Sequence, residues 1–393
     1  MPDGSLMNIL CMTYEYPPIG GGGASVAHPL AAALVERGHK VDVVTSGMRD
    51  LPSYEICDGV DVHRVRCFRR CRHYATTPEL IANAASSYKF ALNLVKRYDF
   101  DINHTHFALP SGLASYLLYK RTGLPYVLTI HGSDIPGYNP DRFRLEHVLA
   151  RPLWRKIILN SSAIIAASEC LKDLFHETID VPVTVIPNGY TLTAEHGSLE
   201  NKKKRILVVS RIFPRKGIQY FLESLVGLTH DWEVLIVGDG PYLPELKKQA
   251  ARSGLNVRFT GYQQGKALED LYASSRIFVF PSAHENFPVV LLEAMEAGCA
   301  IITTNAPGCS RVIGDAGIVV DPESPDQIRD ALVGLMADQS RIVKLGAMAR
   351  ERLGQFQWDQ IAASYEVELR TAKSGGRSAS TDRPTVDCVD HQG

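Results

Sequence analysis

The sequence predicts an α/β protein with two doubly wound domains, each built on a parallel β-sheet. Short apolar segments of strand type alternate with helical segments of about 10–15 residues along most of the chain, which is typical of βαβ units. The alternation occurs in two sets, separated by a polar stretch at residues 191–205. The length of 393 residues suits two or three domains of roughly 150 residues each.

The first set predicts an N-terminal, Rossmann-like domain at residues 1–190. An apolar run at 6–13 is followed by a loop and by a helix at about 25–37, which Gly38 ends. A second amphipathic helix is expected at about 79–97. The other strands expected here are short and buried, at 41–45, 102–105, 126–130, 163–167 and 183–186.

The second set predicts a second Rossmann-like domain at residues 191–355. Its strands are expected at 205–210, 233–237, 257–260, 277–280 and 300–303. The basic run from Lys202 to Arg205 is expected to be the solvated end of the linker. A helix at 356–372 follows. The polar segment 373–393 cannot bury enough apolar surface to offset its ordering entropy, so it is predicted to be a disordered tail.

Composition and charge exclude several classes of protein. Lys and Arg number 42 and Asp and Glu 43, and this balance disfavours binding of nucleic acid through the overall field. No apolar run approaches the ~18 residues of a membrane span, and the start of the chain lacks the basic and apolar regions of a secretory signal. The eight cysteines are scattered without a Cys-x-x-Cys motif, which predicts reduced thiols in a cytoplasmic protein and no zinc site.

A glycine-rich loop, Gly20 to Gly23, stands between the first strand and the first helix. Glycines such as Gly21 and Gly22 let the backbone approach an anion, which the N–H groups of the following helix can bind. The loop is not a Gly-x-Gly-x-x-Gly fingerprint, and the second strand does not end in a ribose-binding acid, so an NAD(P) dehydrogenase is disfavoured. A plain flexible loop and an anion- or sugar-facing loop both remain open at this point.

Histidines end two of the predicted strands of the first domain. His131 follows the strand at 126–130 and begins the run His131-Gly132-Ser133-Asp134. Ligands bind at the carboxyl ends of the strands in an open α/β sheet, so His131 is a candidate site residue. His106 follows the strand at 102–105 and is a second candidate. For both histidines a structural role is the alternative, because a lone histidine is more often structural.

Two basic side chains, Arg211 and Lys216, follow the first strand of the second domain. Together they could hold a diphosphate, the arginine by paired hydrogen bonds and the lysine as a point charge. A basic surface loop is the alternative. Gly240 lies in the turn after the next strand, at a place where a ligand or another backbone segment comes close.

The segment 284–295 carries the sharpest pattern. Pro288 suits the first position of a helix, and the N–H groups just beyond it lack partners and favour an anion. Glu293 lies about five residues, or roughly 7.5 Å, into this helix, about one ribose away from a pyrophosphate at its start. Its neighbours are apolar, so its carboxylate needs a partner, which the two hydroxyls of a ribose would supply. A surface carboxylate, or one paired with arginine, is the alternative.

Glu285 and Glu293 are separated by seven residues and look like the Glu-x7-Glu signature of retaining glycosyltransferases with the two-domain GT-B fold. The chain resembles glycosyltransferase family 4 over residues 7–370. The resemblance is also carried by the glycine-rich loop, the His131 segment and the segments 186–189, 211–217, 238–241 and 315–317. It implies a cleft between the two domains and a last helix that crosses back to the first domain.

The resemblance implies a role for each candidate residue. Arg211 and Lys216 would bind the donor diphosphate and stabilise the leaving nucleotide, Glu285 would meet the sugar hydroxyls, and Glu293 would bind the ribose. His131 would face the donor sugar. The further donor-binding residues would be Gly21, Gly22, Gly240, Asn286, Phe287, Pro288 and Val289. Asn286-Phe287-Pro288 replaces the commoner Gly-Phe-Gly of the family, a change that bears on the choice of donor sugar.

The implied activity is transfer of a hexosyl unit, with retention, from a nucleoside-diphosphate sugar to a glycan or lipid-linked acceptor. If both glutamates bind hydroxyls, no carboxylate is left as a nucleophile, which favours same-face displacement assisted by the leaving diphosphate. No cofactor and no metal are expected, because Arg211 and Lys216 would supply the positive charge. The metal-binding pattern Asp99-Phe100-Asp101 is interpreted as chance. A sugar-nucleotide epimerase and a non-catalytic nucleotide-sugar-binding protein are the alternatives.

An arginine-rich segment in the first domain gives a hint about the acceptor. Residues Arg64 to Arg72 include five arginines and one phenylalanine. Such a stretch can dock on anionic lipid headgroups, at roughly 1 kcal/mol per charge. This favours a peripheral association with the inner face of the membrane. A solvated loop, or a contact with an acidic acceptor, is the alternative.

Overall fold

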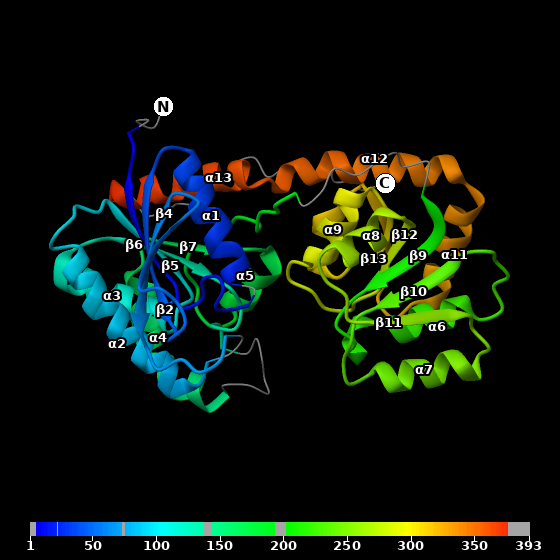
Figure 1. Ribbon diagram of the computed structural model, residues 1–393, viewed down its shortest axis with the longest axis horizontal. Coiled ribbons are helices and arrows are strands. Elements are labelled where there is room, and N and C mark those ends of the chain that lie inside the picture. Colours follow the sequence, from blue (N-terminus) through cyan, green and yellow to red (C-terminus); the bar gives the residue numbers. More distant parts are fainter. Residues whose placement is uncertain (1–4, 22, 73–74, 137–143, 193–201, 376–393) are drawn as a thin grey trace. The chain divides into compact units, whose positions relative to one another are not determined.

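The computed structural model describes residues 5–21, 23–72, 75–136, 144–192 and 202–375. The chain divides into two units (Figure 1). Unit 1 is Met1–Gly189 together with Trp358–Gly393, and unit 2 is Tyr190–Gln357. The predicted disordered tail lies outside the described residues from position 376 onward. In the described part of the chain, no helix is long and apolar enough to cross a membrane.

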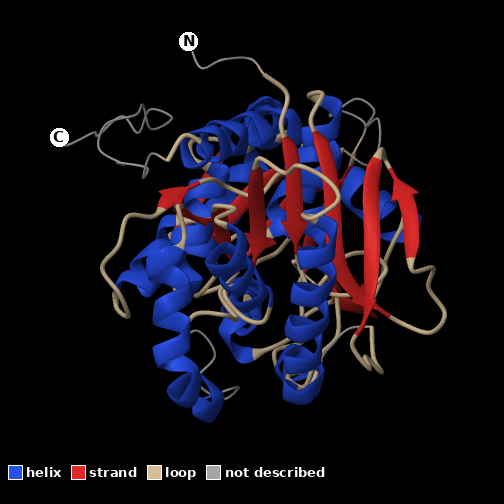
Figure 2. Ribbon diagram, turned by 90° about the vertical axis from the view of Figure 1, so that its left-hand side faces the viewer, coloured by secondary structure: helices blue, strands red, loops and turns tan. Residues whose placement is uncertain are grey.

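Unit 1 is built on an eight-stranded sheet with the order β3-β4-β2-β1-β5-β6-β7-β8. The strands are β1 Asn8–Met12, β2 Lys40–Gly47, β3 Tyr54–Cys57, β4 Val60–Arg66, β5 Ile102–His106, β6 Tyr126–Ile130, β7 Ala163–Ala166 and β8 Thr184–Val185. The helices are α1 Ala24–Glu36, α2 Thr77–Leu94, α3 Ser111–Thr122, α4 Arg144–Asn160, α5 Glu169–His176 and α13 Trp358–Lys373. Helices cover both faces of the sheet (Figure 2).

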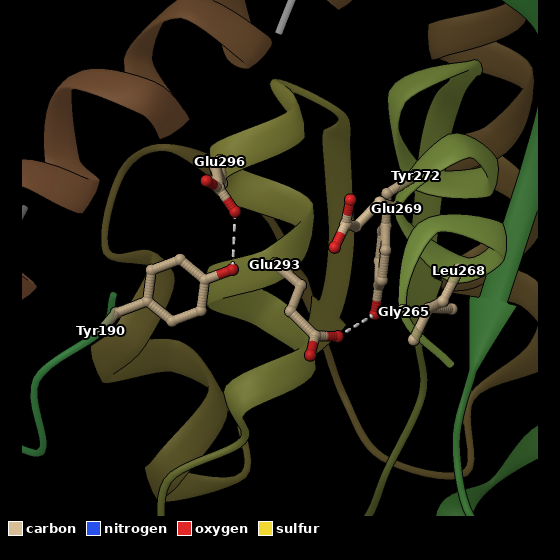
Figure 3. Close-up of a pocket in the computed structure, with 7 residues that line it drawn as sticks. All are labelled: Tyr190, Gly265, Leu268, Glu269, Tyr272, Glu293 and Glu296. Atoms are coloured by element: carbon tan, nitrogen blue, oxygen red, sulfur yellow. Dashed lines mark hydrogen bonds between the residues drawn. The ribbon is translucent and has the colours of Figure 1, made fainter. Parts of the chain in front are cut away.

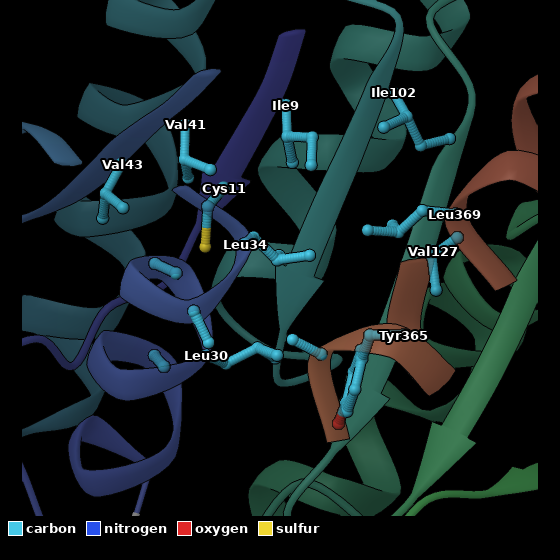
Figure 4. Close-up of a cluster of buried hydrophobic side chains, with 14 of the residues drawn as sticks. Ile9, Cys11, Leu30, Leu34, Val41, Val43, Ile102, Val127, Tyr365 and Leu369 are labelled. Atoms are coloured by element: carbon cyan, nitrogen blue, oxygen red, sulfur yellow. The ribbon is translucent and has the colours of Figure 1, made fainter. Parts of the chain in front are cut away.

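The two faces of this sheet are built by alternating side chains. Ile9 and Cys11 of β1 face α1 and α13, whereas Leu10 and Met12 face α2 and α3. Figure 4 shows the first of these cores, in which Leu30 and Leu34 come from α1 and Tyr365 and Leu369 from α13. The C-terminal helix is therefore part of the core of unit 1, as the resemblance implied. An ion pair between Lys373 Nζ and Asp101 Oδ1, 2.8 Å apart, holds its end.

The β3–β4 hairpin was not foreseen from the sequence. The two strands pair antiparallel, while the other strand pairs described in this sheet are parallel. They are joined by Asp58 and Gly59, whose φ angles are 49° and 76°. An Asp-Gly pair with positive φ at both positions is the preferred two-residue hairpin turn, so the sequence did contain a signal for it.

Unit 2 is built on a six-stranded parallel sheet with the order β11-β10-β9-β12-β13-β14. The strands are β9 Lys203–Val209, β10 Glu233–Val237, β11 Val257–Gly261, β12 Ser275–Phe280, β13 Ala300–Thr304 and β14 Gly317–Val320. The helices are η2 Pro214–Lys216, α6 Ile218–Leu225, α7 Leu243–Arg252, α8 Lys266–Ala273, α9 Val289–Ala297, α10 Pro307–Ile313, α11 Pro325–Ala337, α12 Gln339–Leu353 and η3 Gly354–Phe356. Helices α9, α10 and α12 pack on one face, and α6, α7 and α11 on the other.

The basic run before β9 is not a solvated linker end, so that expectation is wrong. β9 begins at Lys203, and both Lys202 and Arg205 are buried. Lys202 Nζ donates to the carbonyls of Tyr272 and Ser275, and Arg205 pairs with Glu233. These basic groups are buried because each has a fixed polar partner.

In each sheet, the order in which successive strands are added reverses at one point, the switch point. In unit 2, strands are added on one side of β9 up to β11, and then on the other side from β12. In unit 1, β2 lies on one side of β1 and β5 on the other. Ligands of doubly wound folds bind outside the carboxyl ends of the strands at such switch points. The two doubly wound parallel sheets confirm the predicted fold class.

Candidate active site

The loops at the switch point of unit 2 bring Lys216 and Glu285 together. Lys216 follows β9 and Glu285 follows β12, which are neighbouring strands. Lys216 Nζ forms an ion pair with Glu285 Oε1, and the side chains are only 10% and 14% exposed. Ser282 Oγ donates to the same carboxylate oxygen at 2.8 Å. The two residues that the sequence assigned to phosphate and sugar binding are thus in direct contact.

Close backbone packing holds the loop that carries Glu285. Gly217, at φ 70°, lies against Pro281 so tightly that a Cβ would be 1.9 Å from its carbonyl oxygen. On the other side, a Cβ on Gly308 would be 2.4 Å from the carbonyl oxygen of Glu285. Two glycines therefore let the neighbouring segments clamp residues 281–286. Gly308 was not picked out from the sequence, because nothing in the local pattern shows what it packs against.

The glycine at position 240 is explained by close packing within the protein. It adopts φ 159°, and a Cβ there would be 2.2 Å from the carbonyl oxygen of Ile212. Gly238, at φ 132°, lies equally close to the carbonyl of Ser210. The turn after β10 is thus packed against the Arg211 segment, and this explains both glycines. Donor binding by Gly240 stays a prediction.

Arg211 differs from Lys216 in its surroundings. Its side chain is exposed, and its guanidinium has no hydrogen-bond or ion-pair partner among the described residues. The peptide carbonyl of Arg211 accepts from Ser210 Oγ and from the N–H of Phe213, which fixes the backbone at this position. A charged group on a fixed backbone beside the switch point is available for an anionic ligand.

The segment from Asn286 to Val289 leads into α9, one residue later than expected. Pro288 is the N-cap and Val289 the first helical residue, whereas the sequence placed Pro288 at the first helical position. Phe287 packs against the core of unit 2, where its ring meets that of Phe356 with the centroids 5.8 Å apart. Asn286 is half-buried and packs beside Gly308.

Glu293 lies at the fifth position of α9 and lines a small pocket of about 110 Å³ (Figure 3). Its Oε2 accepts a 2.6 Å hydrogen bond from the hydroxyl of Tyr272, a residue of α8. Burial raises the pKa of Glu293, although the Tyr272 hydrogen bond opposes this. The carboxylate therefore already has a protein partner, which the sequence reasoning did not foresee. The other residues that line the pocket are Tyr190, Gly265, Leu268, Glu269 and Glu296.

In unit 1, His131 stands at the carboxyl end of β6. Its ring Nε2 is 3.0 Å from Nδ1 of His106, which ends β5, and its backbone N–H donates to Asp134 Oδ1 at 3.0 Å. The second oxygen of Asp134 accepts from the N–H of Ala108. Burial lowers the pKa of His131 to about 4, so its ring is neutral at pH 7. His131 and His106 are thus parts of one hydrogen-bonded group.

Phe107 connects His131 with the glycine-rich loop. Its ring centroid is 4.4 Å from that of His131 and 4.7 Å from that of Tyr14. A Cβ on Gly23 would be 2.3 Å from the Phe107 ring, so a side chain at position 23 would displace that ring. Phe107 itself adopts φ 71°, a strained conformation for a bulky residue and one that often marks a functional region.

The two glycines of this loop that were predicted to bind the donor are Gly21 and Gly22. Gly21 is exposed, with open space around it, and its N–H donates to Glu15 Oε2 at 3.1 Å. The anion that this N–H binds is thus the protein's own carboxylate. Gly22 lies outside the described residues.

The arginine-rich segment is mostly structural, which corrects the expectation of an exposed stretch of five charges. Arg64 and Arg69 are buried. Arg69 donates to the carbonyls of Tyr14, Cys71 and Arg72, because a guanidinium can satisfy several acceptors at once. Arg72 pairs with Asp50. Arg66 and Arg70 are exposed, and Phe68 between them is 84% exposed.

Asp99 and Asp101 hold other parts of unit 1. Asp101 accepts from the N–H of Asn8 at 2.8 Å as well as pairing with Lys373, and the carbonyl of Asp99 accepts from the Asn8 side chain. Both residues connect β1 with the segment before β5, and Asp101 also holds the end of α13. These contacts give the Asp101 carboxylate a structural role, whereas Asp99 contributes only its backbone carbonyl.

Two Rossmann-like units, with a buried Lys–Glu pair at one switch point and a histidine pair in the other unit, define a GT-B glycosyltransferase. The comparisons with known proteins agree. The family described as Glycosyltransferase Family 4 matches residues 20–193, and the one described as Glycosyl transferases group 1 matches residues 193–352. The chain belongs to glycosyltransferase family 4, as the sequence motifs indicated.

The relatives are similar over nearly their whole length. Glycosyltransferase MJ1607 of Methanocaldococcus jannaschii is 30% identical over 384 residues, which cover 91% of this chain and 96% of the relative. N-acetyl-alpha-D-glucosaminyl L-malate synthase of Bacillus anthracis is 28% identical, with 92% and 97% covered. Phosphatidyl-myo-inositol mannosyltransferase of Mycolicibacterium smegmatis is 27% identical, with 91% and 92% covered.

A solved structure supports the fold. Sucrose-phosphate synthase from Thermosynechococcus elongatus superimposes with a TM-score of 0.74 at 20% identity, covering 94% of this chain and all of that one. At this identity the likeness concerns the fold alone.

Proposed function

We propose that the protein is a retaining glycosyltransferase that moves a hexosyl unit from a nucleoside-diphosphate sugar to a glycan or lipid-linked acceptor. The observation that carries this is the Lys216–Glu285 pair at the switch point of unit 2, with the exposed Arg211 guanidinium on the same loop as Lys216. A cation pair can bind a diphosphate, while a carboxylate beside it can accept hydrogen bonds from sugar hydroxyls.

The proposed reaction is a displacement on one face of the sugar. The bond between C1 and the diphosphate oxygen breaks, the acceptor oxygen bonds to C1 on the same face, and the acceptor proton passes to the leaving diphosphate. Negative charge develops on the diphosphate, where Arg211 and Lys216 would stabilise it in a partly dry site. These two cations would act in place of a metal ion.

The surroundings of the two glutamates support this over a double displacement. Glu285 is held by Lys216 and Ser282, and Glu293 by Tyr272. A nucleophilic mechanism needs one carboxylate free to attack C1 and a second group to act as acid. Carboxylates with fixed partners suit hydroxyl binding better, with Glu285 on the sugar and Glu293 on the ribose. His131, whose ring is neutral at pH 7, would donate or accept a hydrogen bond at the donor sugar.

For the acceptor we propose a lipid-linked molecule at the inner face of the cytoplasmic membrane. Support comes from Phe68, Arg66 and Arg70, which are exposed at the end of β4 and on the loop that follows it in unit 1. An exposed aromatic between two cations suits a surface of anionic headgroups. One relative is named for transfer to phosphatidyl-myo-inositol, and another for L-malate, so family members differ in acceptor.

The experiment is a panel of UDP- and GDP-sugars with the full-length protein, with and without Arg211→Met. Because Arg211 is exposed and its guanidinium has no partner in the described part of the chain, the variant should fold normally and lose at least tenfold in transfer, or about 1.4 kcal/mol. Arg215→Met is the matched control, since Arg215 is also exposed and lies on the same connection between β9 and α6. Equal rates for wild type and R211M would refute the donor site. Isomerised donor without transfer would instead identify an epimerase, and binding without turnover a binding protein.

A further inference from the structure

We propose that unit 1 carries a divalent metal site formed by His28, Cys57 and Asp58, separate from the candidate active site. His28 Nε2 lies 3.5 Å from Cys57 Sγ and 3.0 Å from Asp58 Oδ2. The three ligand atoms all lie within 4.8 Å of one another. A thiol, an imidazole and a carboxylate are the three side-chain types that bind zinc.

The hairpin turn brings these groups together. Cys57 is the last residue of β3, and Asp58 begins the two-residue turn to β4. The turn rests on α1, where a Cβ on Gly59 would be 2.8 Å from Val35. Val35 and His28 are seven residues apart in α1 and so lie on the same face of the helix. The backbone of the turn and the face of α1 therefore fix where the ligand atoms meet.

The spacing of the ligand atoms suits a tetrahedral ion. With Zn–S of about 2.3 Å and Zn–N of about 2.0 Å, a tetrahedral angle separates sulfur and nitrogen by about 3.5 Å and nitrogen and oxygen by about 3.3 Å. The Sγ–Nε2 distance matches this, and the Nε2–Oδ2 distance is 0.3 Å shorter. The site is also open to solvent, since the side chain of His28 is 23% and that of Asp58 65% exposed. Water can therefore enter and complete the coordination.

A second group of similar chemistry lacks this access. Cys11, His104 and His106 also lie close together, but all three are buried in the core of unit 1. Because none of these three side chains reaches the surface, a hydrated ion cannot bind to one of them and then lose its water. The accessible group at the hairpin is therefore the one that the structure favours.

The groups around Cys57 and His28 bear on how an ion would bind. Burial raises the pKa of the Cys57 thiol, helped by Asp58 and Glu55 and opposed by Arg64. Binding of a metal ion by the Cys57 sulfur would release the proton of its thiol. Tyr16 packs edge-on against His28, with the ring centroids 5.3 Å apart. Its buried hydroxyl has no partner within the described ranges, and a metal-bound water would supply one.

The test uses the untagged, full-length protein, stripped with a chelator and titrated with Co²⁺ alone and then with Zn²⁺ alone. We expect one equivalent of Co²⁺ to give a thiolate-to-cobalt charge-transfer band, which one equivalent of Zn²⁺ removes. Cys57→Ser should abolish the band. Asp58→Asn keeps a residue that accepts positive φ, so the turn should survive while the affinity falls at least tenfold.

Cys71→Ser is the matched control, because Cys71 is another half-buried thiol of unit 1 outside the group. It should leave the band and the stoichiometry unchanged. Circular dichroism and thermal unfolding of each variant establish that it is folded. If the wild type gives no thiolate band, or if the band survives in folded C57S, the three residues form only a hydrogen-bonded ion pair and no metal site. Transfer activity is not part of the readout, so the outcome does not depend on the proposed reaction.

Discussion

Gly308 and Glu285 are in backbone contact: the Gly308 N–H donates to the Glu285 carbonyl at 3.2 Å, and a Cβ on Gly308 would be 2.4 Å from the same oxygen. Any side chain at position 308 must therefore displace the backbone that carries the Glu285 carboxylate. Gly308 is a positioning residue that touches no substrate in the proposed reaction but determines where Glu285 stands.

The first prediction concerns this contact. Gly308→Ala should lower transfer at least tenfold, because the Glu285–Asn286 backbone has to move. Gly354→Ala is the control, since no atom lies within 4 Å of a Cβ there, and it should change transfer less than twofold. The rates are also measured in a Glu285→Ala background, where G308A should add little if it acts through Glu285. A full additional tenfold loss in that background would mean that Gly308 acts independently of Glu285.

The second prediction concerns the partner of Glu293. Tyr272→Phe removes the 2.6 Å hydrogen bond and leaves a half-buried carboxylate oxygen with one fewer donor, which costs about 1–3 kcal/mol of unfolding free energy. The pKa of Glu293 should rise further, since the Tyr272 hydrogen bond lowers it. When the pH is lowered, the Glu293 carboxylate of the variant should therefore become protonated at a higher pH than in the wild type, and nucleotide affinity should start to weaken there. Tyr262→Phe, at an exposed tyrosine, should change neither quantity.

The third prediction separates two adjacent arginines. Arg69→Met should lower the free energy of unfolding by about 2–3 kcal/mol or more, because the carbonyls of Tyr14, Cys71 and Arg72 lose their donor. Arg70→Met, at an exposed position, should leave stability unchanged but weaken binding to anionic vesicles about fivefold, or roughly 1 kcal/mol. Urea unfolding and vesicle sedimentation measure the two effects. If R70M binds vesicles as the wild type does, this loop is not the membrane contact.

The fourth prediction concerns pH. Burial lowers the pKa of His131 to about 4 and that of His104 to about 3, so both are neutral in the folded protein where they would be charged in the unfolded chain. Above pH 6.5 they have no effect on stability. Between pH 6.5 and 4 the unfolded state binds more protons, so the free energy of unfolding decreases as the pH is lowered, by up to about 1.4 kcal/mol per pH unit for each histidine.

Hydrogen exchange of peptides covering β5 and β6 reports this change locally. Protection there should fall between pH 6.5 and 5, after correction for the intrinsic pH dependence of exchange, while peptides of β9 and β12 serve as the reference. Equal changes in both sets of peptides would contradict a role for the buried histidines.

The fold was accessible from the sequence wherever periodicity alone decides it. The buried strands β1, β5, β6, β10 and β12 were placed close to their observed bounds, because fully buried parallel strands are short apolar runs. β3 and β4 were missed because their side chains alternate in burial and include Arg64 and His63. The Asp58-Gly59 turn was the signal that could have revealed them.

The candidate site was accessible only in part. Arg211, Lys216, Glu285 and Glu293 could be predicted as site residues from residue type and spacing, since the chemistry of diphosphate and sugar binding calls for both. Gly308, Tyr272 and Phe107 were not, because each acts on a residue far away in the chain and nothing in its own segment shows the contact. The same limit explains Arg64 and Arg69: a run of arginines has the same sequence pattern whether its guanidinium groups face water or buried carbonyl groups.

Helix α13 also determines when unit 1 can be completed. Tyr365 and Leu369 fill its core, and the chain reaches them only after all of unit 2 has been made. At about 5–20 residues per second, the ribosome needs on the order of ten seconds or more to pass through unit 2. During that time the nascent first unit has an uncovered groove along β5 and β6. We therefore expect a chaperone to bind this face during translation, and ribosomes stalled before residue 358 to carry an aggregation-prone first half.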